Sequence, residues 1–402
     1  MTAAPPTIEE WARLPAEQQP DWRSHPAHGR VRTKLAEAPA LVFPEELRAL
    51  RAGLAEVAAG RAVALQAGDC AESFYESTAE HVAGKLAALE SLATHFADRA
   101  GIPVLRIGRL GGQFGKPRSA PTESVDGEDL LAFHGHLVNS EIPSPAGRRP
   151  DPRRLLWGYQ FASEAQRAMR RLRETGEPVA ESINPGPWSS HDALVLDYEG
   201  PLVRTDEATG DRYLASTHLP WLGARTADLA GAHVALLSTI VNPVAVKVST
   251  RMTPAALIAL CAALDPERVP GRLTLIPRMG ATTIAAALPP LVRAVRSAGH
   301  PVVWLSDPMH GNTIRTASGR KTRYLDAMVA EASAFNVLLS AHGSHPGGLH
   351  LETAAEAVTE CVGGSVGSER ELADNYTSLC DPRLTSDQAI ALIDRVAVEP
   401  KE

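Results

Sequence analysis

The sequence has few cysteines, no long block of one charge and no long apolar segment. Four cysteines in 402 residues are too few for a disulfide framework, so we expect thiols that pack in the core or bind metal. A net charge of -7 without a basic block argues against nucleic acid or an anionic membrane surface as partner. The polar, acidic N-terminus resembles no signal peptide, and no uninterrupted apolar stretch of about 18 residues occurs. We therefore predict a soluble, cytoplasmic homo-oligomer, a dimer or tetramer, whose other partners are small molecules.

Eight short apolar runs recur along the chain, which at 44% hydrophobic residues can bury one large core. Each run ends in polar or glycine-containing residues, and none alternates strictly between polar and apolar positions. This pattern is typical of strands that are buried on both faces of a parallel sheet. The runs cover residues 62–70, 103–112, 181–188, 213–223, 243–249, 272–280, 301–311 and 347–354.

Helical patterns separate most of these runs, for example over 79–99, 253–264 and 284–299. Eight strand-and-helix units indicate an α/β fold, a closed (β/α)8 TIM barrel, as a catalytic domain over residues 61–402. The alternative is an open doubly wound sheet, which is disfavoured because no G-x-G-x-x-G fingerprint opens the first unit. Residues 1–60 have helical spacing on both sides of a proline-rich, charged stretch, so we predict an N-terminal helical extension.

Cationic side chains gather at the ends of the predicted strands. The carboxyl ends of barrel strands face the active site, and here they carry Arg109, Lys247 and Arg278. One lysine at such a position is usually a solvated loop charge. Chance does not explain why several apolar runs end in a cation. Because these groups bind phosphate and carboxylate oxygens, we predict substrates that together carry two phosphates.

A second set of side chains has the chemistry of a metal site. Cys70, His310 and Glu352 end the first, seventh and eighth predicted strands, which are neighbours in a closing barrel. Taken singly, each is more often a core thiol, a hydrogen-bonded turn histidine or a surface acid. Together with Asp381, which only a returning loop could deliver, they offer sulfur, nitrogen and oxygen ligands. This mixture suits Mn, Fe, Co or Zn better than Ca or Mg, and an open position would let the ion polarise a carbonyl oxygen.

Several segments resemble the signature segments of a known enzyme family. Between residues 62 and 384 they occur in the same order as in the type II 3-deoxy-D-arabino-heptulosonate-7-phosphate (DAHP) synthases, and the short phenazine-pathway members are the most similar in length. The resemblance implies a metal-dependent transferase that condenses phosphoenolpyruvate with D-erythrose 4-phosphate, with Mn as the expected metal and Co, Fe or Zn as alternatives. The segments include QAGDCAESF, RLGGQFGKPRS, NPVAVKV, RLTLIPRMGA, WLSDPMHGNT, HPGGLHLETAAEAVTECVGG and YTSLCDPRLT.

The resemblance also implies roles for individual residues. The implied metal ligands are Cys70, His310, Glu352 and Asp381. The implied phosphoenolpyruvate ligands are Arg109, Lys247 and Arg278, with Arg225 at the boundary of the two substrates. The implied ligands at the erythrose 4-phosphate end are Lys116, Arg118, Ser119 and Lys321. Lys116, Lys247 and His310 are the catalytic candidates, and the general acid among them stays open.

The chain departs from the family pattern at positions near the expected substrates. Ala224 stands where type II members usually have a glutamate, Ser249 and Thr250 stand where Gly-Pro is usual, and Asp192 replaces a common glutamate. These changes leave two alternatives: an aminoDAHP synthase-like variant with another phosphorylated aldehyde acceptor, or a catalytically impaired binding partner. The second is disfavoured because all the expected metal ligands and phosphoenolpyruvate cations are present.

The resemblance further bears on regulation. Longer type II enzymes carry an extra helix pair that binds aromatic amino acids, whereas here one helical segment, 155–176, fills the corresponding gap. We therefore expect little or no feedback inhibition by phenylalanine, tyrosine or tryptophan, and a role in chorismate-derived secondary metabolism.

Overall fold

Eight parallel strands form a barrel in the computed structural model, which describes residues 8–125, 127–175 and 183–396. The strands follow each other around the sheet in chain order, and the last strand, β14, pairs with the first, β1. The ring closes at Ser306, whose N–H donates to the Gly348 carbonyl at 2.9 Å and whose carbonyl accepts from the His350 N–H at 2.7 Å. The predicted TIM barrel is confirmed. Its strands are β1 (Val63–Gly68), β2 (Val104–Arg109), β5 (Trp188–Asp192), β8 (Leu219–Leu222), β9 (Val244–Val248), β10 (Leu273–Pro277), β11 (Val303–Trp304) and β14 (Gly348–Glu352).

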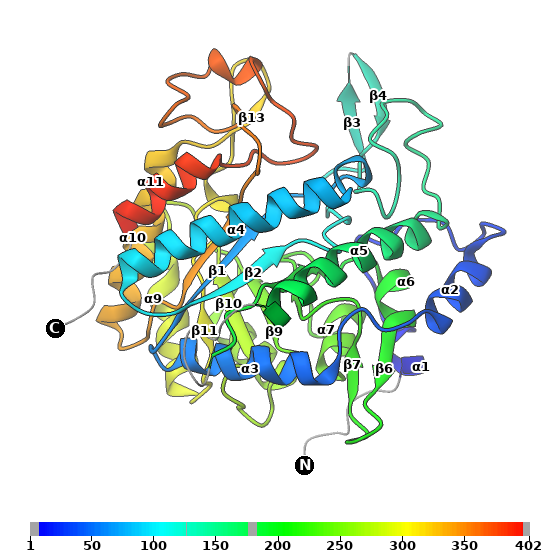
Figure 1. The fold of residues 1–402 in the computed structure, drawn as a ribbon, viewed down its shortest axis with the longest axis horizontal. Helices are drawn as coiled ribbons and strands as arrows, with labels where there is room; N and C mark the ends of the chain where they lie inside the picture. Colours follow the sequence, from blue (N-terminus) through cyan, green and yellow to red (C-terminus); the bar gives the residue numbers. More distant parts are fainter. Residues whose placement is uncertain (1–7, 126, 176–182, 397–402) are drawn as a thin grey trace.

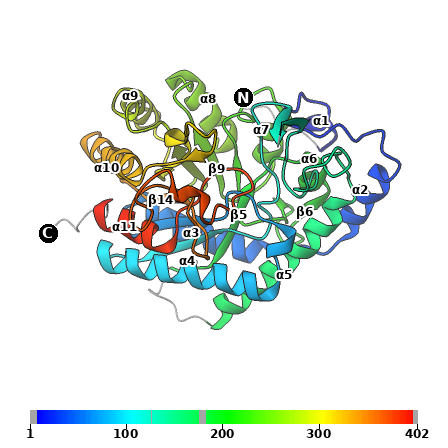
Figure 2. The same cartoon turned by 90° about the horizontal axis from the view of Figure 1, so that it is seen from above.

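Helices surround the barrel because their apolar faces cover the strands (Figures 1 and 2). In α4, for example, Leu92 and Phe96 belong to the same buried cluster as Leu65 of β1 and Leu351 of β14. This burial on both faces explains why the strands read as continuous apolar runs. The helices are α1 (Ile8–Trp11), α2 (His28–Glu37), α3 (Pro44–Ala58), α4 (Ala79–Ala100), α5 (Arg154–Thr175), α6 (Leu196–Glu199), α7 (Ala232–Ser238), α8 (Pro254–Leu264), α9 (Ile284–Ser297), α10 (Leu325–Ala341) and α11 (Ser386–Val396).

Helix α3 closes one end of the barrel. Leu50 and Leu54 of this helix share a buried cluster with Leu105 of β2, Leu219 of β8 and Leu305, which directly follows β11. The opposite end, at the carboxyl ends of the strands, therefore remains for a site, as in other TIM barrels. The division of the chain at residue 60 stays a prediction.

Short hairpins and 3-10 helices lie at the carboxyl ends of the barrel strands and in the loops. In the part of the chain that the structure describes, three antiparallel hairpins and four 3-10 helices belong to this group, and the hairpin β3–β4 stands at the same end of the barrel as β13 (Figure 1). The hairpins are β3 (Thr122–Val125) with β4 (Glu128–Leu131), β6 (Val203–Thr205) with β7 (Arg212–Leu214), and β12 (Ile314–Arg315) with β13 (Lys321–Thr322). The 3-10 helices are η1 (Phe74–Glu76), η2 (Gly200–Leu202), η3 (His310–Asn312) and η4 (Glu371–Ala373).

Two predicted strands differ from the strands of the structure. The run 181–188 was predicted as the third strand, but β5 begins only at Trp188, and residues 181–182 lie outside the described residues. Pro185 and Pro187 explain the difference, since proline has no N–H to donate to a sheet. The run 213–223 contains two elements, because its start belongs to β7 of a hairpin and only its end forms β8.

None of the helices in the described residues combines the length and the apolar character that crossing a bilayer needs.

Candidate active site

A cavity of about 890 Å³ opens at the carboxyl ends of the barrel strands. Arg109 ends β2, Asp192 ends β5, Lys247 lies in β9 and Arg278 directly follows β10, so neighbouring strands deliver these side chains to one place. All the side chains that were predicted to bind substrates line this cavity, namely Arg109, Lys116, Arg118, Ser119, Arg225, Lys247, Arg278 and Lys321. Their individual roles stay predictions, but their convergence gives the cavity a strongly cationic wall.

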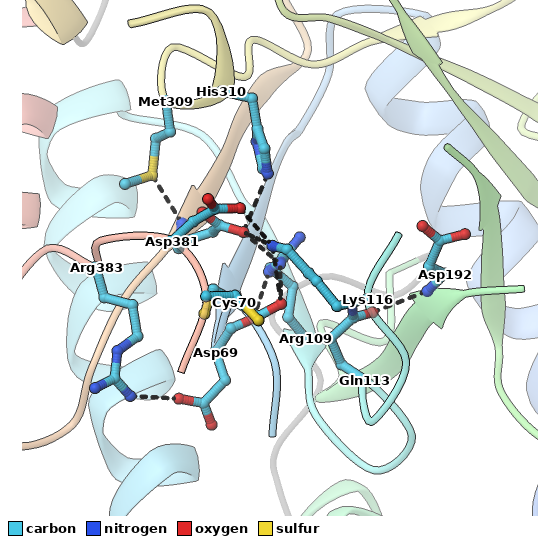
Figure 3. A network of polar contacts seen from close by, with 12 residues as sticks. Asp69, Cys70, Arg109, Gln113, Lys116, Asp192, Met309, His310, Asp381 and Arg383 are labelled. Atoms are coloured by element: carbon cyan, nitrogen blue, oxygen red, sulfur yellow. Dashed lines mark hydrogen bonds and ion pairs between the residues drawn. The ribbon is translucent and has the colours of Figure 1, made fainter. Parts of the chain in front are cut away.

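Three of the four predicted metal ligands lie together beside this wall. His310, Glu352 and Asp381 each offer a ligand atom, and these atoms lie within 4.8 Å of one another. The ammonium group of Lys116 lies between the two carboxylates, 3.3 Å from Glu352 Oε1 and 2.8 Å from Asp381 Oδ2 (Figure 3). A cation thus already sits between these oxygens, and the imidazole and carboxylate donors suit a divalent transition metal. The residues fit a metal site.

Asp307 orients the histidine of this group. Its Oδ2 lies 2.8 Å from His310 Nδ1 and 2.6 Å from the ammonium of Lys247. His310 then presents Nε2, which lies 3.1 Å from Glu352 Oε1, toward the carboxylates. Burial would raise the pKa of Asp307, but His310 and Lys247 outweigh it and hold that pKa well below its ordinary value. A carboxylate behind a histidine is the usual support of a metal ligand.

Glu352 is fully buried and remains ionised because cations surround it. Arg109 Nη2 donates to Oε1 at 2.9 Å, and Arg323 Nη1 donates to Oε2 at 2.8 Å. Burial would raise the pKa of Glu352, but His310, Lys116, Arg323 and Arg109 together hold it well below its ordinary value. The same reasoning applies to Asp381, whose pKa Lys116 lowers against the effect of burial. Both groups are therefore carboxylates that are ready to bind a cation.

Inside the barrel, a short relay of hydrogen bonds fixes Arg109. Its Nη1 lies 2.7 Å from His350 Nε2, and His350 Nδ1 lies 2.6 Å from Gln66 Oε1. Burial holds the pKa of His350 well below its ordinary value, so the ring is neutral. Its Nδ1–H then donates to Gln66, and its Nε2 accepts from Arg109. The guanidinium is thereby held with 2% of its side chain exposed.

Lys247 is a cation whose charged form is destabilised by burial. Burial lowers its pKa to about 7, although the neighbouring Asp307 opposes this effect. Its ammonium lies 5.9 Å from the centre of the Trp221 ring, and the guanidinium carbon of Arg109 lies 5.0 Å from the same ring. Lys247 and Arg109 therefore flank one aromatic side chain, and an anion between them would meet two positive charges.

At the outer end of the cavity, Arg118 and Lys321 face carboxylates of the protein itself. Lys321 Nζ lies 2.7 Å from Asp381 Oδ1, and Arg118 pairs with Glu123 of β3. The backbone N–H of Arg118 donates to Gln18 Oε1 at 2.8 Å, so the N-terminal segment supports this loop. An anion that binds here would replace these carboxylates as the ion-pair partner of Arg118 and Lys321.

Cys70 is not part of the three-residue group. Its sulfur lies 3.3 Å from Ser378 Oγ, while its backbone carbonyl accepts from Arg109 Nη2 and Lys116 Nζ, each at 3.4 Å. Figure 3 shows Cys70 in the middle of this network, between Asp381 and Asp69. Its role as a fourth ligand stays a prediction.

Four residues that support the site had no predicted role. Asp307 and His350 lie in the predicted runs 301–311 and 347–354, but the sequence alone did not indicate their contacts. Arg323 pairs with Glu352 from the segment before α10, and Glu331 of α10 accepts from the loop after β10. Neither position carries a local sequence signal, because each is defined by a partner on another element.

The fold and the site together define a class of protein: a TIM-barrel enzyme for phosphorylated anions, with a group of residues that could hold a metal. The chain matches the model of the class-II DAHP synthetase family over residues 6–184 and 181–397. It belongs to this family.

Relatives with assigned names agree with this result. The chain is 46% identical over 379 residues, 94% of each chain, to a probable phospho-2-dehydro-3-deoxyheptonate aldolase of Pseudomonas fluorescens. It is 39% identical to the phospho-2-dehydro-3-deoxyheptonate aldolase of Streptomyces coelicolor, with 98% of this chain and 97% of the relative covered. It is 37% identical to that of Mycolicibacterium smegmatis, with 95% and 92% covered.

A solved structure supports the fold. The phospho-2-dehydro-3-deoxyheptonate aldolase of Francisella tularensis matches with a TM-score of 0.54 at 12% identity, over 91% of this chain and 95% of that one. At 12% identity, this match is evidence only that the two proteins share the barrel fold.

Proposed function

We propose that the protein is a DAHP synthase, which condenses phosphoenolpyruvate with D-erythrose 4-phosphate and water to give DAHP and phosphate. One observation carries the proposal: a cationic cavity adjoins a group of residues that fits a divalent metal. The reaction needs both, because two phosphorylated anions must be held together while an aldehyde is made electrophilic. The names of the relatives point to the same activity.

In this proposal His310, Glu352 and Asp381 hold the metal, with Cys70 as the fourth ligand. Bound there, a divalent ion supplies Lewis acidity at the aldehyde oxygen of the acceptor. Manganese is the expected ion, and cobalt, iron or zinc are the alternatives that the donor set allows.

The cations bind and align the two substrates. Arg109, Lys247 and Arg278 hold phosphoenolpyruvate, and Arg225 lies at its boundary with the acceptor. C3 of phosphoenolpyruvate then forms a bond to the aldehyde carbon, whose oxygen becomes a hydroxyl by taking a proton. Water adds at C2, and phosphate leaves with the electron pair of the C2–O bond.

The acceptor phosphate occupies the outer end of the cavity. Arg118, Ser119 and Lys321 bind it, and Lys116 lies between this end and the metal site. Lys116 keeps its positive charge, because Asp381 and Glu352 raise its pKa against the effect of burial. Lys116, Lys247 and His310 therefore remain the candidates for proton transfer at the acceptor.

The decisive assay is release of phosphate when phosphoenolpyruvate and erythrose 4-phosphate are mixed with the protein. We expect release that stops on chelation and returns when manganese is added. A protein that releases phosphate only with another phosphorylated aldehyde would favour the aminoDAHP-like alternative. A protein that is inactive with every such aldehyde, despite bound metal, would contradict the proposal and favour a binding partner.

We further propose a role in chorismate-derived secondary metabolism, without feedback by aromatic amino acids, and a homo-oligomeric enzyme in the cytoplasm. Only α5 follows the β3–β4 hairpin as a long helix before β5 in the described residues, which supports the absence of an added regulatory helix pair. Phosphate release should be the same with and without millimolar phenylalanine, tyrosine or tryptophan. Strong inhibition by any of the three would contradict this part of the proposal.

A further inference from the structure

Asp192 is a buried carboxylate at the cavity wall with an oxygen that has no partner. It ends β5, only 8% of it is exposed, and it lines the cavity. Its Oδ1 makes no hydrogen bond in the described part of the chain. Its backbone is fixed, because its N–H donates to Gln113 Oε1 at 2.9 Å (Figure 3). A buried polar atom without a partner is costly and needs an explanation.

The other carboxylates of the cavity wall are engaged. Among the described residues, Asp381, Glu123 and Asp192 are the acidic side chains that line the cavity. Asp381 pairs with Lys116 and Lys321, and Glu123 pairs with Arg118 and with a second arginine. Asp192 is therefore the lining carboxylate that forms no ion pair in the described residues, so its charge is not already neutralised by a partner.

Asp192 also lies close to the cations that we propose for phosphoenolpyruvate. It pairs in register with Trp221 of the neighbouring strand β8. The ring of Trp221 is the one that Arg109 and Lys247 flank. Small residues keep the space beside Asp192 open, since a side chain at Gly223 would begin only 3.1 Å from Asp192 Oδ2.

Burial and the neighbouring cations have opposite effects on the pKa of Asp192. Burial raises its pKa to about 6, and His191, Lys116, Lys247 and Arg109 oppose that rise. Arg225 is a further cation near this carboxylate. A group that is mostly ionised at neutral pH, but binds a proton readily, suits general base catalysis followed by return of the proton.

We propose that Asp192 is a catalytic general base, which accepts a proton from the water that adds at C2 of phosphoenolpyruvate. This role rests on the proposed function. The water oxygen forms its bond to C2 as one of its O–H bonds breaks, and the proton passes to the carboxylate of Asp192. When the C2–O bond to phosphate breaks, its electron pair leaves with the phosphate, which takes the proton back from Asp192. The remaining O–H bond at C2 breaks in the same step, its electron pair forms the C2=O bond, and its proton passes to solvent, which balances the proton that the aldehyde oxygen took.

The chain offers a matched control for a test by substitution. Asp265, which follows α8, is 2% exposed, has one oxygen without a partner, and has a pKa that burial raises. It does not line the cavity. Asp265→Asn and Asp192→Asn thus make the same chemical change at two buried carboxylates, of which one faces the cavity.

The test measures phosphate release, KM for phosphoenolpyruvate and metal affinity as functions of pH. For Asp192→Asn we expect kcat to fall about 100-fold or more, with the fall in rate below about pH 6 abolished, because burial places the pKa of Asp192 at about 6. KM and metal affinity should stay within a few-fold, Asp192→Glu should recover part of the rate, and Asp265→Asn should match the unaltered protein. A structural or purely electrostatic role of Asp192 would instead change KM.

The other possible results separate failure of this inference from failure of the proposed function. A kcat for Asp192→Asn within a few-fold of that of the active, unaltered protein overturns the inference and leaves the proposed function intact. If the unaltered protein releases no phosphate, the proposed function is wrong and the inference falls with it. If Asp192→Asn does not fold, Asp192→Ser is compared in the same way, and unchanged kcat in that variant overturns the inference.

Discussion

Glu331 of α10 joins two loops of the site, and its removal gives a quantitative test of how the site is built. Its Oε1 accepts from the N–H groups of Met279 and Gly280, at 2.7 and 2.9 Å, directly after Arg278. Its Oε2 accepts from Asn312 Nδ2 at 2.7 Å, two residues after His310. Glu331 therefore holds the loop of a proposed substrate ligand against the loop of a proposed metal ligand.

The two loops are in backbone contact, so they have little freedom to adjust. A side chain at Gly311 would begin 2.2 Å from the nitrogen of Gly280, whose φ is +86°. Asn312 cannot rotate to suit a new partner, because its Oδ1 already accepts from the Ala281 N–H at 3.0 Å. In Glu331→Gln, an amide N–H of the new glutamine would consequently face an amide N–H of Asn312.

The expected change in stability is small, because two effects oppose each other. Burial raises the pKa of Glu331 from 4.5 to about 7, which at pH 8 corresponds to about 3 kcal/mol against the ionised form in the fold. The substitution removes that cost. It also replaces a hydrogen bond to a charged group by an unfavourable contact, a loss of about 1.5 to 3 kcal/mol. We therefore expect the free energy of unfolding to change by no more than about 1 to 2 kcal/mol.

The expected change in metal binding is larger, because the loop that carries His310 loses the anchor at Asn312, although Asp307 still holds the His310 ring. Loss of a group that orients a metal ligand typically costs about 10- to 100-fold in metal affinity, and we expect a loss near the lower end of this range together with a rise in KM for phosphoenolpyruvate. Titration calorimetry with manganese and steady-state kinetics measure the two effects. Glu46→Gln is the control. The Glu46 carboxylate binds Arg170, Arg173 and His218 at a distance from the cavity, so this substitution should lower the free energy of unfolding and leave metal affinity unchanged. A metal affinity of Glu331→Gln within twofold of the original would refute the reasoning.

Two further substitutions test the ligand assignments. Cys70→Ser should keep the fold and lose most of the metal affinity, because a hydroxyl is a far poorer ligand than a thiolate; unchanged metal content would remove Cys70 from the site. Lys247 has a pKa that burial lowers to about 7, so its ammonium predominates below pH 7 and is lost as the pH rises through 7. KM for phosphoenolpyruvate should therefore rise several-fold between pH 7 and 9, and Lys247→Arg should abolish this dependence; a flat profile in the unaltered protein would show that Lys247 stays charged.

The sequence was sufficient to predict the barrel and the convergence of its cations. Continuous apolar runs identify buried parallel strands, and the carboxyl ends of such strands lie at the same end of the barrel. The sequence alone thus assigns Arg109, Lys247 and Arg278 to one mouth of the barrel. His310 and Glu352 could be placed together for the same reason, since their strands are neighbours in a closed barrel.

The supporting contacts could not be predicted, because they depend on distances between elements that spacing does not set. Asp307 lies in the loop after β11, and only the structure shows that it reaches both Lys247 and His310. Glu331 lies in the middle of a helix, where an acid is normally a solvated surface residue. The start of β5 was missed because the prolines before it interrupt the pairing, while the apolar pattern alone gives no boundary.

Lys116 can couple the binding of the metal ion to the binding of phosphoenolpyruvate. Its ammonium lies 3.3 Å from Glu352 Oε1 and 2.8 Å from Asp381 Oδ2, so a divalent ion would compete with it for the same oxygens. A displaced ammonium remains beside Arg109, with which it shares Glu352 Oε1 as an acceptor, so phosphoenolpyruvate that binds Arg109 would also pair with Lys116. Metal and phosphoenolpyruvate should then favour each other, and because linkage is reciprocal, each should raise the affinity for the other by the same factor, about 5- to 150-fold.

Lys116→Met isolates this effect. It removes the competing cation, so metal should bind more tightly in the absence of phosphoenolpyruvate, and the mutual enhancement should largely vanish. Calorimetric titration of manganese with and without saturating phosphoenolpyruvate measures both quantities on the original protein and on the variant. If the enhancement is absent from the original protein, or survives in Lys116→Met, then Lys116 does not couple the two sites, and its position between the carboxylates serves only to neutralise their charge.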